Sequence, residues 1–215
     1  MYSGKTFSEN DSPKVYRVLL IGASVGQEWN LPQWPKRMKN NNVSLEMIPV
    51  YSFDKSQVLG EVLMRPRRKF NFNRSYIKGF FSPPPRRPDI IIIKECAAYF
   101  PGDLENYKTL VKKWMQQSIA AGIKPVVATV VPVTQEHSQK RPGRLPGILE
   151  YNDWIKSYTK EVGISCFDLE SALRISKDDR RLSPDLTSGD GLHLNGKAYH
   201  ILDVTLKENL EQHSY

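Results

Sequence analysis

Residues 15–26 read VYRVLLIGASVG, an apolar run that ends in a glycine-containing turn and a serine. A run that is apolar at nearly every position is typical of a strand buried on both faces of a parallel sheet. Four further runs rich in β-branched residues follow it, at 43–50, 90–93, 123–131 and 164–167. The sequence therefore predicts a parallel sheet whose first strand leads directly to Ser24.

Helical patterns lie between the later strands. Residues 103–121 repeat apolar side chains at helical spacing and are followed by Gly122, and residues 149–162 do the same before Gly163. A last helix is expected at about 195–210, whereas Pro32 and Pro35 exclude a long regular helix at 27–39. Strands that alternate with helices predict an α/β fold, a single three-layer domain with helices on both faces of the sheet.

Two polar or basic segments lie outside this pattern. Residues 1–14 are polar and predict a flexible tail before a domain at 15–215. Residues 65–88 form a long Pro/Arg-rich insertion, and long connections in compact domains are often functional. The net charge of +8 is concentrated there, which indicates an anionic partner. Between residues 62 and 88 no residue is acidic and eight are basic: Arg65, Arg67, Arg68, Lys69, Arg74, Lys78, Arg86 and Arg87.

Cysteine content and hydropathy exclude some classes of protein. Cys96 and Cys166 are too few for a disulfide scaffold, and both are expected to be free thiols. The sequence contains no run of eighteen apolar residues, so it predicts no transmembrane helix. The N-terminus also lacks the apolar core of a signal peptide. We expect a soluble chain, and both a cytoplasmic location and export with removal of a signal peptide remain open.

Three residues can supply nucleophilic chemistry. Ligands bind beyond the carboxyl ends of parallel strands, which is where Ser24 follows the first strand. Asp190 stands three residues before His193, so its carboxylate can accept a hydrogen bond from the imidazole Nδ1. This bond would leave Nε2 free to take the proton of a serine hydroxyl. We therefore predict a triad of Ser24, His193 and Asp190.

The segments Gly22-Ala23-Ser24 and Asp190-Gly191-Leu192-His193 resemble the first and last motif blocks of the SGNH (GDSL-like) hydrolases, although Ala23 replaces the usual Asp. The segments TVVPV (129–133), YNDW (151–154) and FDL (167–169) fit the same pattern. The resemblance covers roughly residues 15–210. It implies a five-stranded parallel sheet, Ser24 as nucleophile, His193 as base, and no metal or organic cofactor.

The resemblance also implies an oxyanion hole built from the Ser24 N–H, a glycine and an asparagine, and here the sequence departs from the family. Residues 94–99 read KECAAY, so Ala97 stands near the expected asparagine. Loss of one such donor costs about two to three orders of magnitude in rate. The N–H groups of Cys96 or Ala97 are candidate substitutes. Glu95 is a candidate functional residue whose replacement by alanine should lower turnover but leave folding intact, and Trp29 is a candidate pocket residue.

The predicted activity is hydrolysis of a carboxylic ester, with an acetyl group on a carbohydrate as one candidate substrate and transfer to a sugar hydroxyl as a variant. Two alternatives remain, a non-catalytic binding module of the same fold and a polyanion binder that uses the basic insertion. The sequence argues against nucleic acid, because it has no nucleic-acid fold motif and no interleaved aromatic platforms. His137, in a polar run, is expected to be exposed and without a role.

Overall fold

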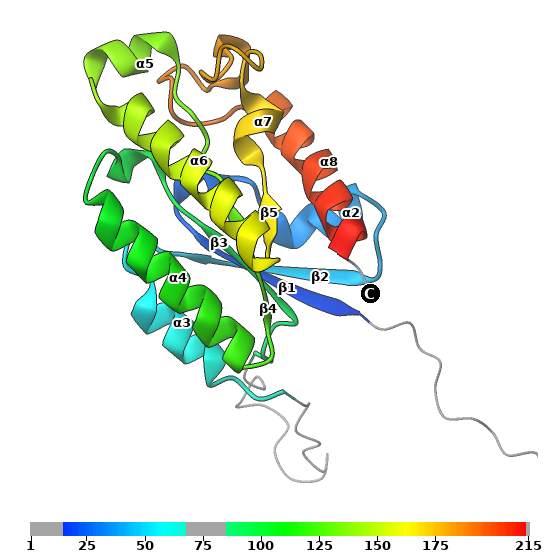
Figure 1. Cartoon of the computed structure of the whole chain (residues 1–215). Coiled ribbons are helices and arrows are strands. Elements are labelled where there is room, and N and C mark those ends of the chain that lie inside the picture. Colours follow the sequence, from blue (N-terminus) through cyan, green and yellow to red (C-terminus); the bar gives the residue numbers. More distant parts are fainter. Residues whose placement is uncertain (1–14, 68–84, 214–215) are drawn as a thin grey trace, which may run out of the picture.

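The computed structural model of the protein describes residues 15–67 and 85–213. One sheet is formed by five strands in the order β2-β1-β3-β4-β5, and every neighbouring pair is parallel (Figure 1). The strands are β1 (Tyr16–Gly22), β2 (Val43–Pro49), β3 (Ile90–Lys94), β4 (Lys124–Ala128) and β5 (Ser165–Phe167). The prediction of a single α/β domain around a five-stranded parallel sheet is confirmed. The tail predicted at 1–14 lies outside the described residues.

Helices cover both faces of the sheet (Figure 1). One face packs against α3 (Ser56–Leu63), α4 (Leu104–Ala120) and α6 (Arg144–Val162). The other packs against α1 (Ser24–Glu28), α2 (Trp34–Arg37), α7 (Leu169–Leu173) and α8 (Gly196–His213). The shorter elements are α5 (Gln135–Lys140) and the 3-10 turns η1 (Leu31–Gln33), η2 (Ala97–Tyr99) and η3 (Pro184–Leu186).

Strand β1 joins two separate hydrophobic cores. Its side chains alternate, so Leu19 and Ile21 enter the core under α3, α4 and α6, whereas Val18 and Leu20 enter the core under α1 and α8. All four side chains are at most 1% exposed. Burial on both faces explains why the sequence of this strand is apolar without alternation.

The helix boundaries follow local sequence signals. Asp103 caps α4 by accepting the N–H of Asn106 at 3.0 Å, and Gly163 ends α6 in the left-handed region with φ of 70°. Helix α6 begins five residues earlier than predicted, because Pro146 falls in its first turn, where no N–H is required. Helix α3 was not predicted. The 27–39 region contains only short helical pieces, as its prolines predicted.

Strand β4 is shorter than the apolar run that predicted it. It ends at Ala128, but Val130, Val131 and Val133 remain buried in irregular backbone. The buried side chain of Asn152 accepts the N–H of Val130 at 2.7 Å and donates to its carbonyl at 2.9 Å. The Asn152 amide thus makes the hydrogen bonds that a partner strand would otherwise make with Val130. Sequence periodicity does not reveal such a contact.

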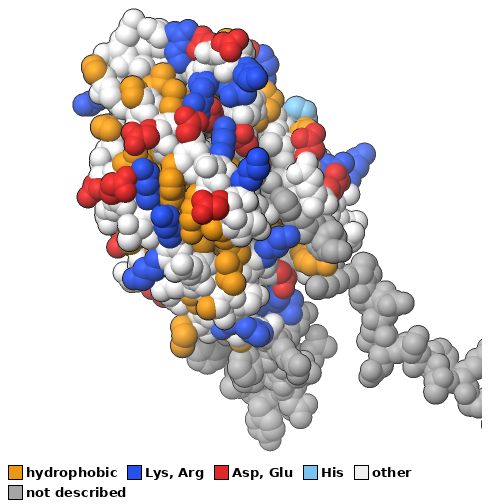
Figure 2. Space-filling view, viewed as in Figure 1, with side chains coloured by type: hydrophobic (Ala, Val, Ile, Leu, Met, Phe, Trp, Pro, Cys, Tyr) orange, Lys and Arg blue, Asp and Glu red, His pale blue; other side chains and the backbone are white. Residues whose placement is uncertain are grey.

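The basic insertion is partly described. Arg65 pairs with Glu46, while Arg67 and Arg87 donate to the carbonyl of Ala121. The other basic residues, apart from Arg86, fall at 68–84, outside the described residues, so the anionic partner stays a prediction. On the face shown in Figure 2, acidic and basic side chains are interspersed. Within 15–67 and 85–213, no helix has both the length and the apolar character that a membrane crossing requires.

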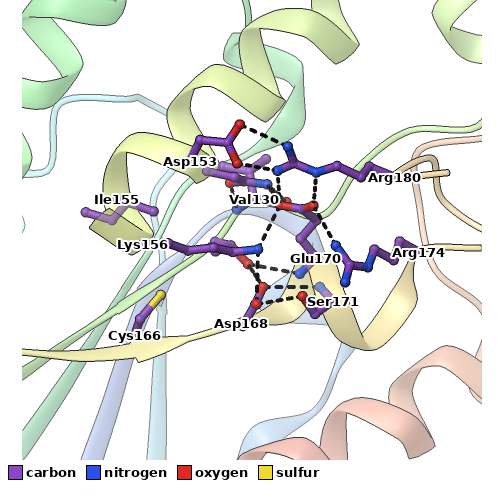
Figure 3. Close-up of polar contacts among 12 residues, drawn as sticks. Val130, Asp153, Ile155, Lys156, Cys166, Asp168, Glu170, Ser171, Arg174 and Arg180 are labelled. Carbon is purple, nitrogen blue, oxygen red and sulfur yellow. Dashed lines mark hydrogen bonds and ion pairs between the residues drawn. The ribbon is translucent and has the colours of Figure 1, made fainter. Parts of the chain in front are cut away.

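A buried carboxylate holds α6, α7 and the segment that follows α7 together (Figure 3). Glu170 is fully buried, and its oxygens lie 2.5 Å from Arg180 Nε and 3.2 Å from Lys156 Nζ. Asn152 also donates to it at 3.0 Å, and Arg174 lies 3.6 Å away. Burial raises the pKa of Glu170, but the bonds from Arg180 and Lys156 lower it more, so the net shift is downward. The carboxylate therefore stays charged and links three elements.

Removal of this carboxylate should destabilise the protein. Glu170→Ala leaves Arg180, Lys156 and Asn152 without their buried acceptor, and we expect unfolding to become easier by about 3–5 kcal/mol. The measurement is urea unfolding of the variant and the wild type.

Asp153→Ala is the matched control, because Asp153 binds the same Arg180 but is 61% exposed. Its loss should cost less than about 1 kcal/mol. Equal effects of the two substitutions would contradict a special role for the buried carboxylate.

Candidate active site

Ser24 lies at the first position of α1, directly after β1. Ala23 is extended, and its carbonyl accepts the N–H groups of Gly26 and Gln27, which starts the helix. Gly26 lets the helix lie close to the sheet, because a Cβ there would be 2.8 Å from Leu20. Ser24 is half-buried, and no acceptor is recorded for its N–H among the described residues. The serine and a free backbone donor thus stand together at the carboxyl end of β1.

Asp190 and His193 form a close pair. His193 Nδ1 lies 2.5 Å from Asp190 Oδ2, and Asp190 Oδ1 accepts the N–H groups of Leu192 at 2.9 Å and His193 at 2.8 Å. Burial raises the pKa of Asp190, but these hydrogen bonds outweigh it and hold the pKa at about 2. The carboxylate is therefore charged near neutral pH and holds Nδ1 in its protonated state, which leaves Nε2 as the acceptor.

The turn that carries this pair is fixed against the segment between β4 and α5. Gly191 has φ of 75°, its carbonyl accepts the N–H of Thr134 at 3.1 Å, and a Cβ at this position would clash with Thr134 and His137. Farther along, Thr187 and Leu194 form an antiparallel bridge. Glycine at 191 is thus required for the pair to reach this edge of the sheet.

The neighbours of Ser24 and His193 are buried on the same face of the sheet. Val25, next to Ser24, and Leu194, next to His193, belong to the same hydrophobic cluster beneath α8. No hydrogen bond joins the Ser24 hydroxyl to His193 in the described part of the chain. Such bonds are often long in unliganded enzymes and shorten when substrate binds. The structure brings Asp190 and His193 into contact and places Ser24 at the same end of the sheet.

The segment after β3 provides backbone donors but no side-chain amide. Cys96 is extended and Ala97 begins η2, and neither N–H has a recorded acceptor among the described residues. Ala97 is 7% exposed and packs into the α4 core.

The two cysteines are free and half-buried. Burial raises the pKa of Cys166 to about 11, so this thiol stays protonated near neutral pH.

Glu95 does not face the site. It is fully buried and lies 2.5 Å from Lys55 Nζ, whose ammonium also sits 5.6 Å from the ring of Trp114. Glu95→Ala would leave the buried Lys55 ammonium without its carboxylate, so the structure leads us to expect that this substitution destabilises the fold, contrary to the expectation from the sequence. The partner is Lys55 because the Glu95 side chain points toward the α4 core.

Trp29 is also a core residue. It is 2% exposed, stacks on Phe167 with ring centroids 6.1 Å apart, and donates its indole N–H to Asp203 at 2.7 Å. Arg37 completes this contact by binding the same carboxylate. The structure therefore places Trp29 between α1 and α8, and its proposed place in a substrate pocket is not supported.

His137 and Arg144 have positions that the sequence did not reveal. His137 is half-buried, with Nδ1 3.1 Å from the carbonyl of Asp190 and Nε2 2.6 Å from Arg144 Nη1. Arginine can only donate, so His137 accepts at Nε2 and donates from Nδ1 to Asp190. The prediction that His137 is exposed is wrong, because the side chain is half-buried. The pair braces the backbone of Asp190 from α5 and α6.

Metal chemistry finds no ready ligand set here. Within the described ranges, no group of three or more His, Cys, Asp or Glu side chains is arranged to hold a metal ion.

Comparison with solved structures identifies the fold. The chain is similar to a GDSL-like lipase from Bacteroides thetaiotaomicron, with 17% identity over 92% of this chain and 88% of that one and a TM-score of 0.65. It is also similar to a lipolytic G-D-S-L protein from Veillonella parvula, with 14% identity, 90% and 97% coverage and a TM-score of 0.61. A variant of an acetyl-xylooligosaccharide esterase from a Geobacillus gives 11% identity, 92% and 94% coverage and 0.63.

The chain therefore has the fold of the SGNH/GDSL-like hydrolases, which confirms the resemblance drawn from its motifs. No family model matches the sequence, and no curated protein matches it either.

The pKa of Asp190 should depend on His193. In His193→Phe the imidazole donor is lost while the two backbone donors remain, so the pKa should rise from about 2 toward the ordinary value of 3.8. Because the folded-state pKa lies below the ordinary value, Asp190 stabilises the protein above about pH 4, and this contribution is lost as the pH falls toward 2. Carboxyl ¹³C NMR between pH 5 and pH 3 measures the shift.

Asp168 is the internal reference for this titration, because its pKa is also low but depends on Ser171 and Lys156. A wild-type Asp190 that titrates near its ordinary value would show that the pair is not formed in solution.

Proposed function

We propose that the protein is a serine hydrolase that cleaves a carboxylic ester through Ser24, His193 and Asp190. The observation that carries this proposal is the hydrogen-bonded pair of Asp190 and His193, which lies at the same end of the sheet as Ser24. The SGNH-type fold and the order of the motifs support it.

The reaction follows from the roles of these groups. Ser24 Oγ attacks the ester carbonyl carbon while His193 Nε2 takes the hydroxyl proton, and Asp190 stabilises the resulting imidazolium. The tetrahedral intermediate then expels the alcohol, which receives that proton from His193. Water, activated by His193 in the same way, attacks the acyl-serine and releases the acid. If a sugar hydroxyl takes the place of water, the same residues transfer the acyl group.

Backbone donors can stabilise the oxyanion in this proposal. The N–H of Ser24 and those of Cys96 and Ala97 have no recorded acceptor within the described residues. Preorganised N–H groups aimed at the developing charge provide a large part of the catalysis in acyl transfer. Backbone N–H groups would thus replace the amide that Ala97 cannot supply.

An O-acetyl group on a carbohydrate is the substrate that we favour. One protein of the same fold is an acetyl-xylooligosaccharide esterase, which is a precedent for a small acyl group on a sugar. Tyr51 and Gln27 extend the candidate site on its exposed side, since Tyr51 is 66% exposed and its hydroxyl contacts Gln27 of α1. Aromatic and amide side chains of this kind are suited to a polar glycan.

A non-catalytic binding module remains the second candidate. It is favoured by one observation, the absence of a side-chain donor at Ala97. A polyanion binder has less support, because Arg65, Arg67 and Arg87 already bind acceptors of this chain.

Replacement of the nucleophile tests the proposal. Ser24→Ala should lower the rate of p-nitrophenyl acetate hydrolysis by at least about 10³-fold, because the hydroxyl that forms the proposed acyl-enzyme is lost. A fluorophosphonate probe should label the wild type and not the variant, as measured by intact-protein mass spectrometry.

Ser157→Ala is the matched control, since Ser157 is exposed on α6 and has no part in the proposed site. Its hydrolysis and labelling should equal those of the wild type. If the wild type shows neither Ser24-dependent hydrolysis nor labelling, the protein is not a serine hydrolase, and the binding module becomes the better account.

A further inference from the structure

Lys94 is a buried lysine that forms no ion pair with a carboxylate of the described residues. It is the last residue of β3 and is 1% exposed. Its ammonium donates one recorded hydrogen bond, to the carbonyl of Glu95 at 3.0 Å, and no carboxylate pairs with it among the described residues. A lysine ammonium has three donors, so two remain unused. Burial of an unpaired charge is costly, and such groups are commonly retained for function.

The side chain of Lys94 points to the face of the sheet that carries Ser24. Side chains alternate along β3, and Ile90 and Ile92 enter the core beneath α1 and α8. Lys94 continues that series. It also lies beside Gly22, where a Cβ would be 3.4 Å from the Lys94 Cβ. Gly22 precedes Ser24 by two residues, which span at most roughly 7 Å.

Lys55 offers a direct contrast, because it is equally buried but fully satisfied. Its ammonium binds Glu95 at 2.5 Å and the carbonyl of Phe53 at 3.1 Å, and it lies 5.2–5.8 Å from three aromatic rings. The Lys55 charge is thus compensated on the α4 face. On the opposite face, no carboxylate of the described residues bonds to the Lys94 ammonium, because the Glu95 carboxylate binds Lys55 and acts on Lys94 only through space.

We propose that Lys94 supplies a buried positive charge that stabilises the oxyanion formed when Ser24 attacks the substrate. The proposal rests on the proposed function and adds an electrostatic group to the backbone donors of the same site. A charge held in place before the reaction requires no reorganisation when the oxyanion develops. The oxyanion would be the counter-ion that Lys94 lacks.

The state of the lysine fits this role. Burial lowers the pKa of Lys94, while Cys96 and Glu95 oppose the change. A negative charge that develops nearby favours the ammonium again, so the charged lysine and the oxyanion stabilise each other.

The size of the effect can be estimated from Coulomb's law. With an effective dielectric constant of about 20, removal of a unit charge that lies within about 10 Å of the oxyanion should slow the chemical step by at least about 10-fold. A direct hydrogen bond to the oxyanion would raise the loss to about 10²- to 10³-fold.

The test compares substitutions of the two buried lysines in the full chain. Lys94→Met keeps the length of the side chain and removes the charge, and Lys94→Gln provides a second neutral variant. We measure kcat and KM for p-nitrophenyl acetate and the melting temperature. We expect kcat to fall at least about 10-fold with KM little changed, and Tm to stay the same or rise, because an unpaired buried charge is removed.

Lys55→Met and Lys160→Met are the controls. Lys55→Met should lower Tm, because it leaves the buried Glu95 carboxylate without its cation. Lys160→Met removes an exposed charge and should change neither kcat nor Tm. A kcat for Lys94→Met within about 3-fold of wild type would overturn the proposal. So would a loss of kcat that accompanies a fall in Tm in both Lys94 variants, since that result describes a structural lysine. A wild type without Ser24-dependent hydrolysis would instead refute the proposed function and this inference with it.

Discussion

The candidate site depends on the parallel pairing of β1 with β2 and β3. In parallel pairs every strand runs the same way, so the segments that leave β1, β3 and β4 emerge at one edge of the sheet. Ser24, the Cys96–Ala97 backbone and the contact of Thr134 with Gly191 are all found in those segments. The last segment, with Asp190 and His193, reaches this edge because Leu194 packs into the core that also holds Val25.

The buried charged side chains of this protein have different roles. Glu170 and Glu95 are both fully buried, and each is held by cations from other elements. These pairs connect helices to loops. Removal of one partner leaves the other charge buried and unpaired, which destabilises the fold. Lys94 differs because its recorded partner is a neutral carbonyl. A buried ammonium without a bonded carboxylate, close to the proposed nucleophile, is more consistent with the proposed role in catalysis than with a role in stability.

The oxyanion hole is where this chain departs from the family that it resembles. A side-chain amide and a backbone N–H are equivalent donors if both are held rigidly at the correct distance. At η2 the N–H groups of Cys96 and Ala97 have no acceptor among the residues that the structure describes. Gly147 lets α6 lie close to the adjoining loop, since a Cβ there would be 2.8 Å from Pro101. In the proposed function, backbone N–H groups therefore take the place of a specific side-chain amide. A sequence motif does not show such backbone geometry.

Hydrophobic periodicity and short motifs are local, so they predicted the approximate strands, the longer helices, and the candidates Ser24, Asp190 and His193. Tertiary structure decided which side chains face the site. Glu95 and Lys94 are adjacent in sequence but point to opposite faces of the sheet. Trp29 is buried and donates its indole N–H to Asp203, which is 174 residues later in the chain. His137 gained its contact with Asp190 in the same way. Strand alternation accounts for the opposite directions of Lys94 and Glu95, but the partners of Glu95, Trp29 and His137 come from distant segments, so no local pattern could have predicted them.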